Sequence, residues 1–331
     1  HYANEQIQIA CIGVGGKGKS DSLDAAREGK VVAICDIDDQ TREQVAAGEG
    51  FGDARQFVDF REMLTELGDE IDAVTVSTPD HTHAVAASMA MSMGKHCFCQ
   101  KPLTHSIYEA RVLGELARAK DCKTQMGNQG TAETGVRKAA GFLKAGGLGR
   151  VKEVHVWTNR PVWPQDIARP SDTPAVPSHV HWDQWIGPAP YRPYHPAYHP
   201  FKWRGFWDFG TGALGDMACH TLNMAFMGLN LRDPVSVEAT TSGHNEETFP
   251  GSSKIKFEFP QLGDRGPIDM YWYDGGNVPD RSLFTEEMID WLLALHDEQK
   301  GAVDPGELMR SGSMIVGEKG VMFSPDDYGA E

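Results

Sequence analysis

Three groups of residues have types and spacings that suit chemistry. Residues 13–18 read G-V-G-G-K-G, Lys101 directly precedes a proline, and Asp216 and His220 are four residues apart. A glycine-rich turn can approach phosphate groups closely, an ammonium can hold a reacting oxygen, and a carboxylate–imidazole pair can hold a proton. Together these types are suited to taking a proton from an alcohol while a hydride leaves its carbon.

The glycines fit the pattern G-x-G-x-x-G and lie between an apolar run and a helical stretch, which is the context that gives the motif its meaning. The first glycine permits the tight turn, the second lets backbone approach a pyrophosphate, and the third lets helix pack on strand. The free N–H groups of the helix N-terminus then face the phosphates. The alternative is a glycine-rich turn in some other α/β protein.

Asp36 ends the second apolar run, 18 residues after Gly18. A carboxylate at this place accepts hydrogen bonds from both ribose hydroxyls and repels a 2′-phosphate. The sequence therefore predicts NAD as the cofactor and disfavours NADP.

Two loops follow neighbouring predicted strands. Residues 77–83 (S-T-P-D-H-T-H) end one strand, and Gln100-Lys101-Pro102 ends the next. Because ligands of open parallel sheets bind beyond the carboxyl ends of the strands, both loops should face the cofactor. Lys101 is either a surface charge or a polar anchor for substrate, and its position favours the anchor. We expect no metal, because Asp80 and His83 have no third ligand spaced with them.

Asp216 and His220 fall in a predicted helix over 212–227. The spacing of four places them on one face, with Asn223 beside them. The carboxylate can support an imidazolium and orient the ring. On this motif alone, an ordinary surface pair is the simpler interpretation.

Strand and helix signals alternate over residues 1–130, which predicts βαβ units and a parallel sheet. From about Gly149 the pattern changes to strands in which apolar and polar residues alternate. This predicts an α+β domain with a large, mainly antiparallel open sheet over 131–331. The predicted fold class is thus α/β, with an N-terminal Rossmann domain followed by this second domain. The expected strands are Ile7–Ile12, Val31–Cys35, Ile71–Ser77, His96–Cys99, Thr124–Met126, Val151–Thr158, Val235–Thr241, Ser253–Phe259, Ile268–Tyr273 and Ser313–Ser324.

Residues 161–200 hold ten of the 19 prolines, and residues 157–207 hold six of the eight tryptophans. Proline at this density precludes long helices, and loops of such length are often functional. We call residues 157–207 the aromatic segment. Its aromatic rings could stack on sugars, or they could pack the segment against the sheet or a neighbouring subunit, as any single large aromatic residue usually does. We expect no metal at His179 and His181. The candidate sugar contacts are Arg160, Trp163, His181, Trp182, Tyr198, His199, Trp203, Arg204, Trp207 and Asn223.

Composition excludes several classes. The chain has 331 residues, with 47 acidic and 31 basic side chains and a net charge of −16. This argues against binding to nucleic acid or an anionic membrane, and no apolar stretch reaches the 18 residues of a bilayer span. The six cysteines are expected to be buried thiols. Ile255, Phe257 and Phe259 form an alternating apolar stripe, from which we expect an oligomer.

These motifs together resemble the glucose–fructose oxidoreductase and inositol dehydrogenase (Gfo/Idh/MocA) family, from Ile7 to about Asp327. The aromatic segment resembles a bacterial subgroup of sugar or glycoside oxidoreductases. The resemblance implies that Lys101 binds the reacting hydroxyl, that His220 acts as base, and that Asp216 binds substrate or orients His220. It also implies a homodimer or homotetramer through the C-terminal sheet, and a bacterial enzyme of the cytoplasm or, after twin-arginine export, of the periplasm.

The sequence departs from the family at three places. Gln100 stands where glutamate is usual, Asn223 stands where aspartate is frequent, and the family continues beyond Glu331, so a C-terminal segment is expected to be missing. The expected contacts of the cofactor are Gly13, Val14, Gly15, Lys17, Gly18, Asp36, Ile37, Thr78, Pro79, His83, Gln100, Lys101 and Asn128.

Three functions compete. The first is hydride transfer between NAD and a secondary hydroxyl of a sugar or glycoside, as in the formation of 3-keto sugars. The second is a glycosidase or lyase that oxidises its sugar transiently with tightly bound NAD. The third is a sensor of sugar or cofactor without catalysis, against which the retention of Lys101, Asp216 and His220 argues.

Overall fold

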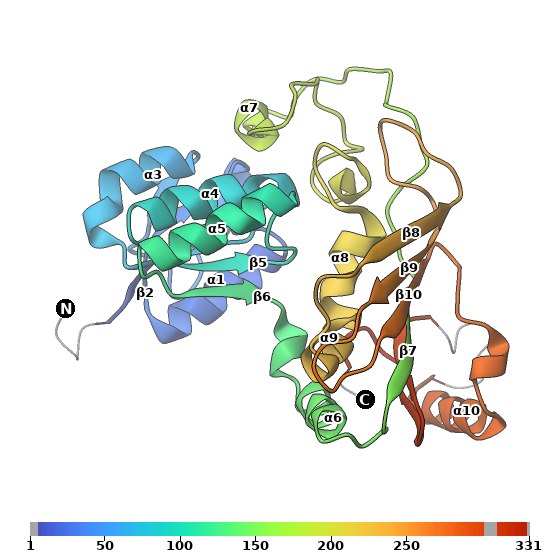
Figure 1. The fold of residues 1–331 in the computed structure, drawn as a ribbon. Coiled ribbons are helices and arrows are strands. Elements are labelled where there is room, and N and C mark those ends of the chain that lie inside the picture. Colours follow the sequence, from blue (N-terminus) through green and yellow to red (C-terminus); the bar gives the residue numbers. More distant parts are fainter. Residues whose placement is uncertain (1–5, 301–309, 330–331) are drawn as a thin grey trace. The chain divides into compact units, whose positions relative to one another are not determined.

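The computed structural model describes residues 6–300 and 310–329, and the chain forms two compact units (Figure 1). Unit 1 extends to Gly127 and also includes Arg169–Thr211, while unit 2 comprises Asn128–Ala168 and the chain from Gly212 onward. The predicted boundary at residue 130 lies close to Gly127–Asn128, where the chain first passes from unit 1 to unit 2. The aromatic segment is different, because most of it packs with the first unit although it follows a strand of the second.

Within the described residues, unit 1 holds a six-stranded sheet in the order β3-β2-β1-β4-β5-β6, and every neighbouring pair is parallel. This confirms the predicted Rossmann arrangement. The short edge strand β3 was not predicted, because its three residues are too few to form a pattern. The strands are β1 (Gln8–Ile12), β2 (Lys30–Cys35), β3 (Arg55–Phe57), β4 (Ala73–Val76), β5 (His96–Gln100) and β6 (Thr124–Gly127).

Helices cover both faces of this sheet. The first face packs against α1 (Lys17–Glu28) and α2 (Asp39–Ala46), and the second against α3 (Phe60–Leu67), α4 (Asp80–Ser92) and α5 (Ile107–Ala119), which Figure 1 shows side by side. Each face has its own apolar cluster, so the central strands are buried on both sides. The carboxyl ends of the strands are thereby left as the edge from which loops can meet a ligand.

Over the described ranges, unit 2 holds a second six-stranded sheet in the order β12-β11-β7-β10-β9-β8. Only the β7–β10 pair is parallel, which confirms a mainly antiparallel sheet. The expected strand Ser313–Ser324 is a hairpin of two strands that turns between Gly317 and Gly320. The strands are β7 (Val151–Trp157), β8 (Ser236–Thr241), β9 (Ser253–Phe259), β10 (Ile268–Asp274), β11 (Gly312–Gly317) and β12 (Gly320–Ser324).

One face of the second sheet is covered by α6 (Thr134–Lys144), α8 (Gly212–Thr221) and α9 (Asn223–Leu229), and Figure 1 shows α8 and α9 lying along it. Ile255, Phe257 and Phe259 of β9 pack into this cluster. The apolar stripe therefore faces the helices of its own unit, and the argument that it needs a second subunit is wrong. An oligomer through this sheet stays a prediction. On the sheet's other face, Trp157 and Phe323 pack against Phe284 and α10 (Glu286–Lys300).

Candidate functional site

The glycine turn of unit 1 has the close packing that the motif requires. Gly13 has φ +76°, and a Cβ on it would lie 2.7 Å from Ser77 O. A Cβ on Gly18 would lie 2.0 Å from Gly13 O, so helix and strand can approach only because both residues are glycine. No side chain caps α1, whose twelve residues begin at Lys17. The backbone N–H groups of the turn and first helical turn can therefore receive a pyrophosphate.

Asp36 follows β2 and is joined to the glycine turn. Its Oδ2 accepts hydrogen bonds from the backbone N–H groups of Val14 (2.8 Å) and Gly15 (3.2 Å), and its Oδ1 accepts one from Asp38 N–H (3.0 Å). Burial raises the pKa of Asp36, and these N–H groups oppose that rise. The carboxylate thus lies where the motif places the ribose ligand, and the residues of this cradle fit NAD.

The expected cofactor contact Lys17 has a partner within α1. Its ammonium pairs with Asp21 and lies 3.1 Å from Ser20 Oγ. About half of the Lys17 side chain is exposed, so an anion at the helix N-terminus would compete with Asp21 for it.

His83 links the two loops beyond β4 and β5. Its Nε2 lies 2.7 Å from Thr78 O and its Nδ1 lies 2.7 Å from Pro102 O, and the ring is buried. The histidine therefore ties the Thr78-Pro79 turn to the loop that carries Lys101. Lys101 itself is half-buried and follows directly from β5.

Gln100 explains one departure from the family. Its Nε2 donates to Asp21 Oδ2 (2.8 Å), which also accepts a hydrogen bond from Ser77 Oγ (2.8 Å), and both Gln100 and Asp21 are buried. A glutamate at position 100 would set a second carboxylate against Asp21. Gly127 makes room for the amide, because a Cβ there would lie 2.7 Å from it. Gln100 is thus the donor that a buried aspartate requires.

In unit 2, Asp216 and His220 lie on α8 and are both buried, at 8% and 3% exposed. His220 Nδ1 lies 2.8 Å from Asn128 Oδ1, while Asn128 Nδ2 donates to Cys219 O (2.5 Å). Because the amide nitrogen already faces a carbonyl, its oxygen faces the ring and can only accept. His220 therefore carries its proton on Nδ1, which leaves Nε2 as the basic nitrogen. Asn128 holds this imidazole in the structure, and its expected contact with the cofactor stays a prediction.

Tyr328 packs against His220, and Arg160 and Asp327 act on Tyr328 through their charges; sequence reasoning missed Tyr328 and Asp327. The Tyr328 ring lies 4.9 Å from the His220 ring, and Arg160 Nη2 lies 3.6 Å from Asp327 Oδ2. Desolvation, followed by the charge of Asp327, raises the pKa of Tyr328. Tyr328 and Asp327 lie more than 100 positions from His220 in an acidic tail that has no motif, so no local signal marked them.

Several candidate sugar contacts have other partners in the structure. Asn223 Nδ2 donates to Thr131 Oγ1 (2.9 Å). Trp163, in unit 2, is 5% exposed and donates from Nε1 to Gln165 Oε1 (2.9 Å). In unit 1, Arg204 covers the Trp203 ring at 4.3 Å and donates to Phe201 O (3.0 Å). Trp207 is half-buried.

Three of the expected stacking rings are internal packing. Trp182 lies face to face with Trp185 at 4.6 Å, Tyr198 is 2% exposed and packs edge-on against Phe206, and Trp203 is 5% exposed. A buried ring has no face to offer a pyranose. The packing alternative therefore describes Trp182, Tyr198 and Trp203 in this structure, and a contact of Trp163, Trp182, Tyr198 or Trp203 with sugar stays a prediction.

The aromatic segment is fastened to the loops that follow β2, β4 and β5. His81, on α4, has its Nε2 3.0 Å from Trp185 O and its Nδ1 3.3 Å from Phe209 O. His105 Nε2 lies 3.0 Å from Gly210 O, and Thr211 Oγ1 donates to Asp80 Oδ2 (2.7 Å). Burial lowers the pKa of His81 to about 4, so its ring is neutral at pH 7.

At the other end of the same edge, the segment meets the residues after Asp36. His181 Nε2 lies 3.0 Å from Asp39 Oδ1. Desolvation lowers the pKa of the half-buried His199, against the attraction of Asp38. Both histidines were expected to contact sugar. The structure places His181 beside the loop that follows Asp36, and a sugar contact of either histidine stays a prediction.

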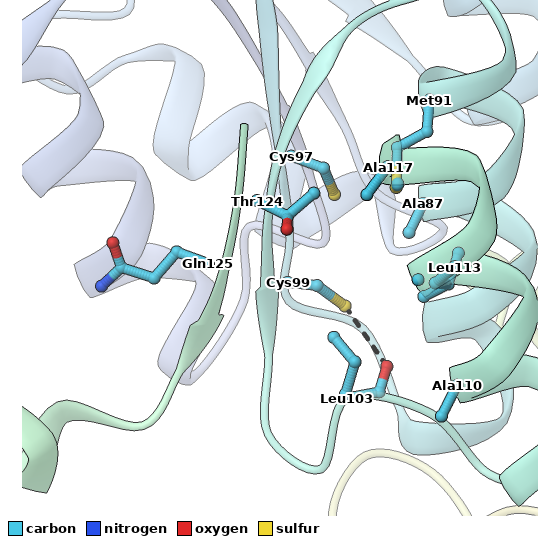
Figure 2. Close-up of a pocket in the computed structure, with 11 residues that line it drawn as sticks. Ala87, Met91, Cys97, Cys99, Leu103, Ala110, Leu113, Ala117, Thr124 and Gln125 are labelled. Atoms are coloured by element: carbon cyan, nitrogen blue, oxygen red, sulfur yellow. Dashed lines mark hydrogen bonds between the residues drawn. The ribbon is translucent and has the colours of Figure 1, made fainter. Parts of the chain in front are cut away.

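A cavity of about 100 Å³ in unit 1 is separate from all these groups. It lies among α4, α5, β5 and β6. The Cys99 thiol, which lines it, donates to Leu103 O (3.6 Å), a bond that Figure 2 marks with a dashed line. Burial raises the pKa of Cys97 to about 12, so the thiols stay protonated. The cavity is an apolar packing void, lined by Ala87, Met91, Cys97, Cys99, Leu103, Ala110, Leu113, Gly114, Ala117, Thr124 and Gln125.

All six cysteines lie in the described part of the chain and are free thiols, five of them buried, as expected. Among residues 6–300 and 310–329, no three His, Cys, Asp or Glu side chains are arranged to hold a metal ion. In the same ranges, no helix has the length and apolar character needed to cross a bilayer.

The chain is similar to known proteins in both of its halves. Residues 7–128 match the NAD-binding Rossmann fold of the Gfo/Idh/MocA oxidoreductase family, and residues 155–263 match the C-terminal alpha/beta domain of that family. It is 23% identical to levoglucosan dehydrogenase of Pseudarthrobacter phenanthrenivorans over 67% of this chain and 50% of that protein. It is 29% identical to inositol 2-dehydrogenase 3 of Saccharopolyspora erythraea over 48% of this chain and 47% of that protein.

Solved structures agree on the fold. GenD2 from gentamicin A biosynthesis, in complex with NAD, superposes with a TM-score of 0.63 at 18% identity, covering 98% of this chain and 73% of that one. Levoglucosan dehydrogenase in complex with NADH and L-sorbose gives 0.61 at 17% identity, covering 96% and 73%. The chain spans about half the length of the curated relatives it matches. With its glycine turn, its two sheets and matches in both units, the chain belongs to the Gfo/Idh/MocA oxidoreductase family and carries that family's NAD-binding Rossmann domain.

Proposed function

We propose that this protein is an NAD-dependent oxidoreductase that transfers hydride between the nicotinamide and a secondary hydroxyl of a sugar or glycoside, in the manner of 3-keto sugar formation. The observation that carries the proposal is the buried His220, whose Nδ1 donates to Asn128 and whose Nε2 is left as a base. The relatives named for levoglucosan and inositol support the substrate class.

Each side chain has one role in the proposed reaction. NAD, when bound, supplies the acceptor for the hydride. Lys101 donates a hydrogen bond to the reacting oxygen and stabilises it as the carbonyl develops. His220 takes the hydroxyl proton on Nε2, and Asn128 keeps the ring in the tautomer that can accept it. The buried carboxylate of Asp216, four residues before His220 on α8, favours the imidazolium that results.

The sugar contacts in this proposal come from polar groups rather than from the packed tryptophans. In unit 2, Arg160, Tyr328 and Asn223 supply donors to hydroxyls, and Arg160 is already oriented by Asp327. In unit 1, His199 and Arg204 are half-buried and keep part of their surface for a ligand.

The test is a screen of pyranosides and their 3-keto forms with purified protein, following the NADH absorbance band. With a sugar that the protein oxidises, Lys101→Ala should lower turnover by about 10²–10³-fold and lower NADH affinity far less. Lys101→Arg is the matched control that keeps the charge and changes the donor geometry. Turnover by Lys101→Ala at the level of the wild type would contradict the role of Lys101.

A second candidate function is a redox-neutral glycosidase or lyase that keeps its NAD bound. The packing of Arg169–Thr211 on the NAD-binding unit favours this alternative, because it adds contacts beside the ribose carboxylate. In such a reaction the sugar carbinol is oxidised, a proton is lost from the adjacent carbon, the aglycone leaves, and after water adds the ketone is reduced again. Release of aglycone without net NADH would identify this reaction, whereas NADH accumulation identifies a dehydrogenase.

A further inference from the structure

Residues His179, Val180 and His181, here called the strap, run antiparallel to the segment that follows Asp36. His181 N–H donates to Ile37 O (2.9 Å), and Asp39 N–H donates to His179 O (2.8 Å). Between these two hydrogen bonds Asp38 and Val180 form an isolated antiparallel bridge. A segment about 140 positions later in the sequence thus adds backbone pairing to the loop that carries the ribose ligand.

Side chains strengthen this pairing. His181 Nε2 lies 3.0 Å from Asp39 Oδ1, His179 Nε2 lies 3.7 Å from Asp38 Oδ2, and Val180 is 6% exposed. Although desolvation acts the other way, the hydrogen bonds from Arg42 and His181 lower the pKa of Asp39, so its carboxylate is charged at pH 7. Hydrogen bonds to charged groups are stronger than neutral ones.

The strap acts on Asp36 through the backbone. Asp38 N–H donates to Asp36 Oδ1 (3.0 Å), and the strap holds the residues on either side of that N–H. An ordered 37–39 loop therefore keeps the Asp36 carboxylate aimed before any ligand arrives. A ligand that meets a preorganised site loses less affinity to the ordering of the protein.

We propose that the strap supports the part of the NAD site that binds the adenosine ribose, by ordering residues 37–39, and that it slows the release of the cofactor. His181 and His179 are positioning residues here, because they act through residues 37–39 on Asp36. The proposal rests on the NAD site of the proposed function and not on the identity of the sugar. Among variants of one binding site, most changes of affinity appear in the dissociation rate of the ligand.

The test uses ADP-ribose, which has the adenosine half of NAD and cannot accept a hydride. Calorimetry on the full chain should show His181→Ala binding ADP-ribose about tenfold more weakly than the wild type, as expected for a lost hydrogen bond to a charged group. In a stopped-flow chase of bound NADH with excess NAD, the same variant should release NADH about tenfold faster. His181→Gln retains a donor toward Asp39 and should restore most of both values.

His195→Ala is the matched control. His195 lies in the same segment and makes a comparable contact with a carboxylate, 3.2 Å from Asp172 Oδ1, away from residues 37–39. It should leave ADP-ribose affinity and NADH release unchanged. If His181→Ala does not fold, His179→Ala carries the same test with a smaller loss, about two- to threefold, because its contact is longer.

Two results overturn the proposal: wild-type affinity for ADP-ribose in the folded strap variants, or an equal loss in His195→Ala. Failure of the proposed function looks different. If His181→Ala weakens ADP-ribose binding as expected, but the wild type neither oxidises nor cleaves any sugar tested, the proposed sugar chemistry is contradicted. The proposed role of the strap is then still supported.

Discussion

In unit 1 the groups proposed to contact the cofactor are mostly backbone atoms within a few residues of one glycine turn, whereas in unit 2 the proposed base, His220, is held by side chains from distant parts of the chain. Gly13 to Gly18 and Asp36 are joined by hydrogen bonds that span at most 22 positions. His220 is held by Asn128, 92 positions away, and packs against Tyr328. The first arrangement leaves a readable motif, and the second leaves scattered residues. The difference predicts which substitutions remove NAD binding and which remove only chemistry.

The largest effect is expected at the glycine turn, where backbone alone makes the site. Gly18→Ala places a Cβ 2.0 Å from Gly13 O, so the turn has to open, and NADH affinity should fall by more than about 100-fold. The control is Gly16→Ala in the same turn, where nothing lies within 4 Å and only the positive φ of +52° is strained. Fluorescence titration with NADH measures both. Equal affinities in the two variants would show that the close approach at Gly18 does not matter.

The corresponding test in unit 2 is Asn128→Ala. The imidazole loses the acceptor for Nδ1–H, so kcat should fall by about 10- to 100-fold through a misplaced base, while NADH affinity stays unchanged. Asn128→Asp keeps an acceptor for the ring and should recover much of kcat. A loss of NADH affinity in Asn128→Ala would instead support the original expectation that Asn128 contacts the cofactor.

Gln100→Glu tests the buried side-chain network of unit 1. The new carboxylate meets Asp21, so the free energy of unfolding at pH 7 should fall by about 1–3 kcal/mol. Repulsion raises the folded-state pKa of the new group above its unfolded value, so the cost is present at pH 7 and is relieved as the pH falls through that raised pKa. Gln100→Met loses the hydrogen bond without adding a charge. Chemical denaturation at pH 7 and pH 5 should show a pH-dependent difference for the glutamate variant only.

A last prediction concerns His81, which anchors the aromatic segment within unit 1. Burial holds the pKa of His81 at about 4, against 6.5 when unfolded, so between these values the unfolded chain binds more protons. The free energy of unfolding should therefore fall as the pH is lowered from 6.5 towards 4, by up to about 1.4 kcal/mol per pH unit. His81→Gln should flatten this slope, and substitution of the exposed His244 should not. Denaturation curves between pH 7 and pH 4.5 compare the three proteins.

The sequence by itself determined the Rossmann unit, the NAD site and the family. Apolar runs alternate with helical stretches, and a glycine turn works only in a short, fixed context, so these features are encoded within a few tens of residues. The pair Asp216 and His220 was equally readable, because four residues along a helix set both side chains on one face.

Only the tertiary structure decided what the aromatic segment packs on and what its side chains do. Its prolines and tryptophans predicted a stiff loop, but the hydrogen bonds that join it to Ile37, His81 and His105 connect residues more than 100 positions apart. The partners Asn128 and Tyr328 of His220 were hidden for the same reason. Burial of the tryptophan rings and the inward facing of Ile255 and Phe259 depend on which helices cover them, and no local pattern encodes that choice.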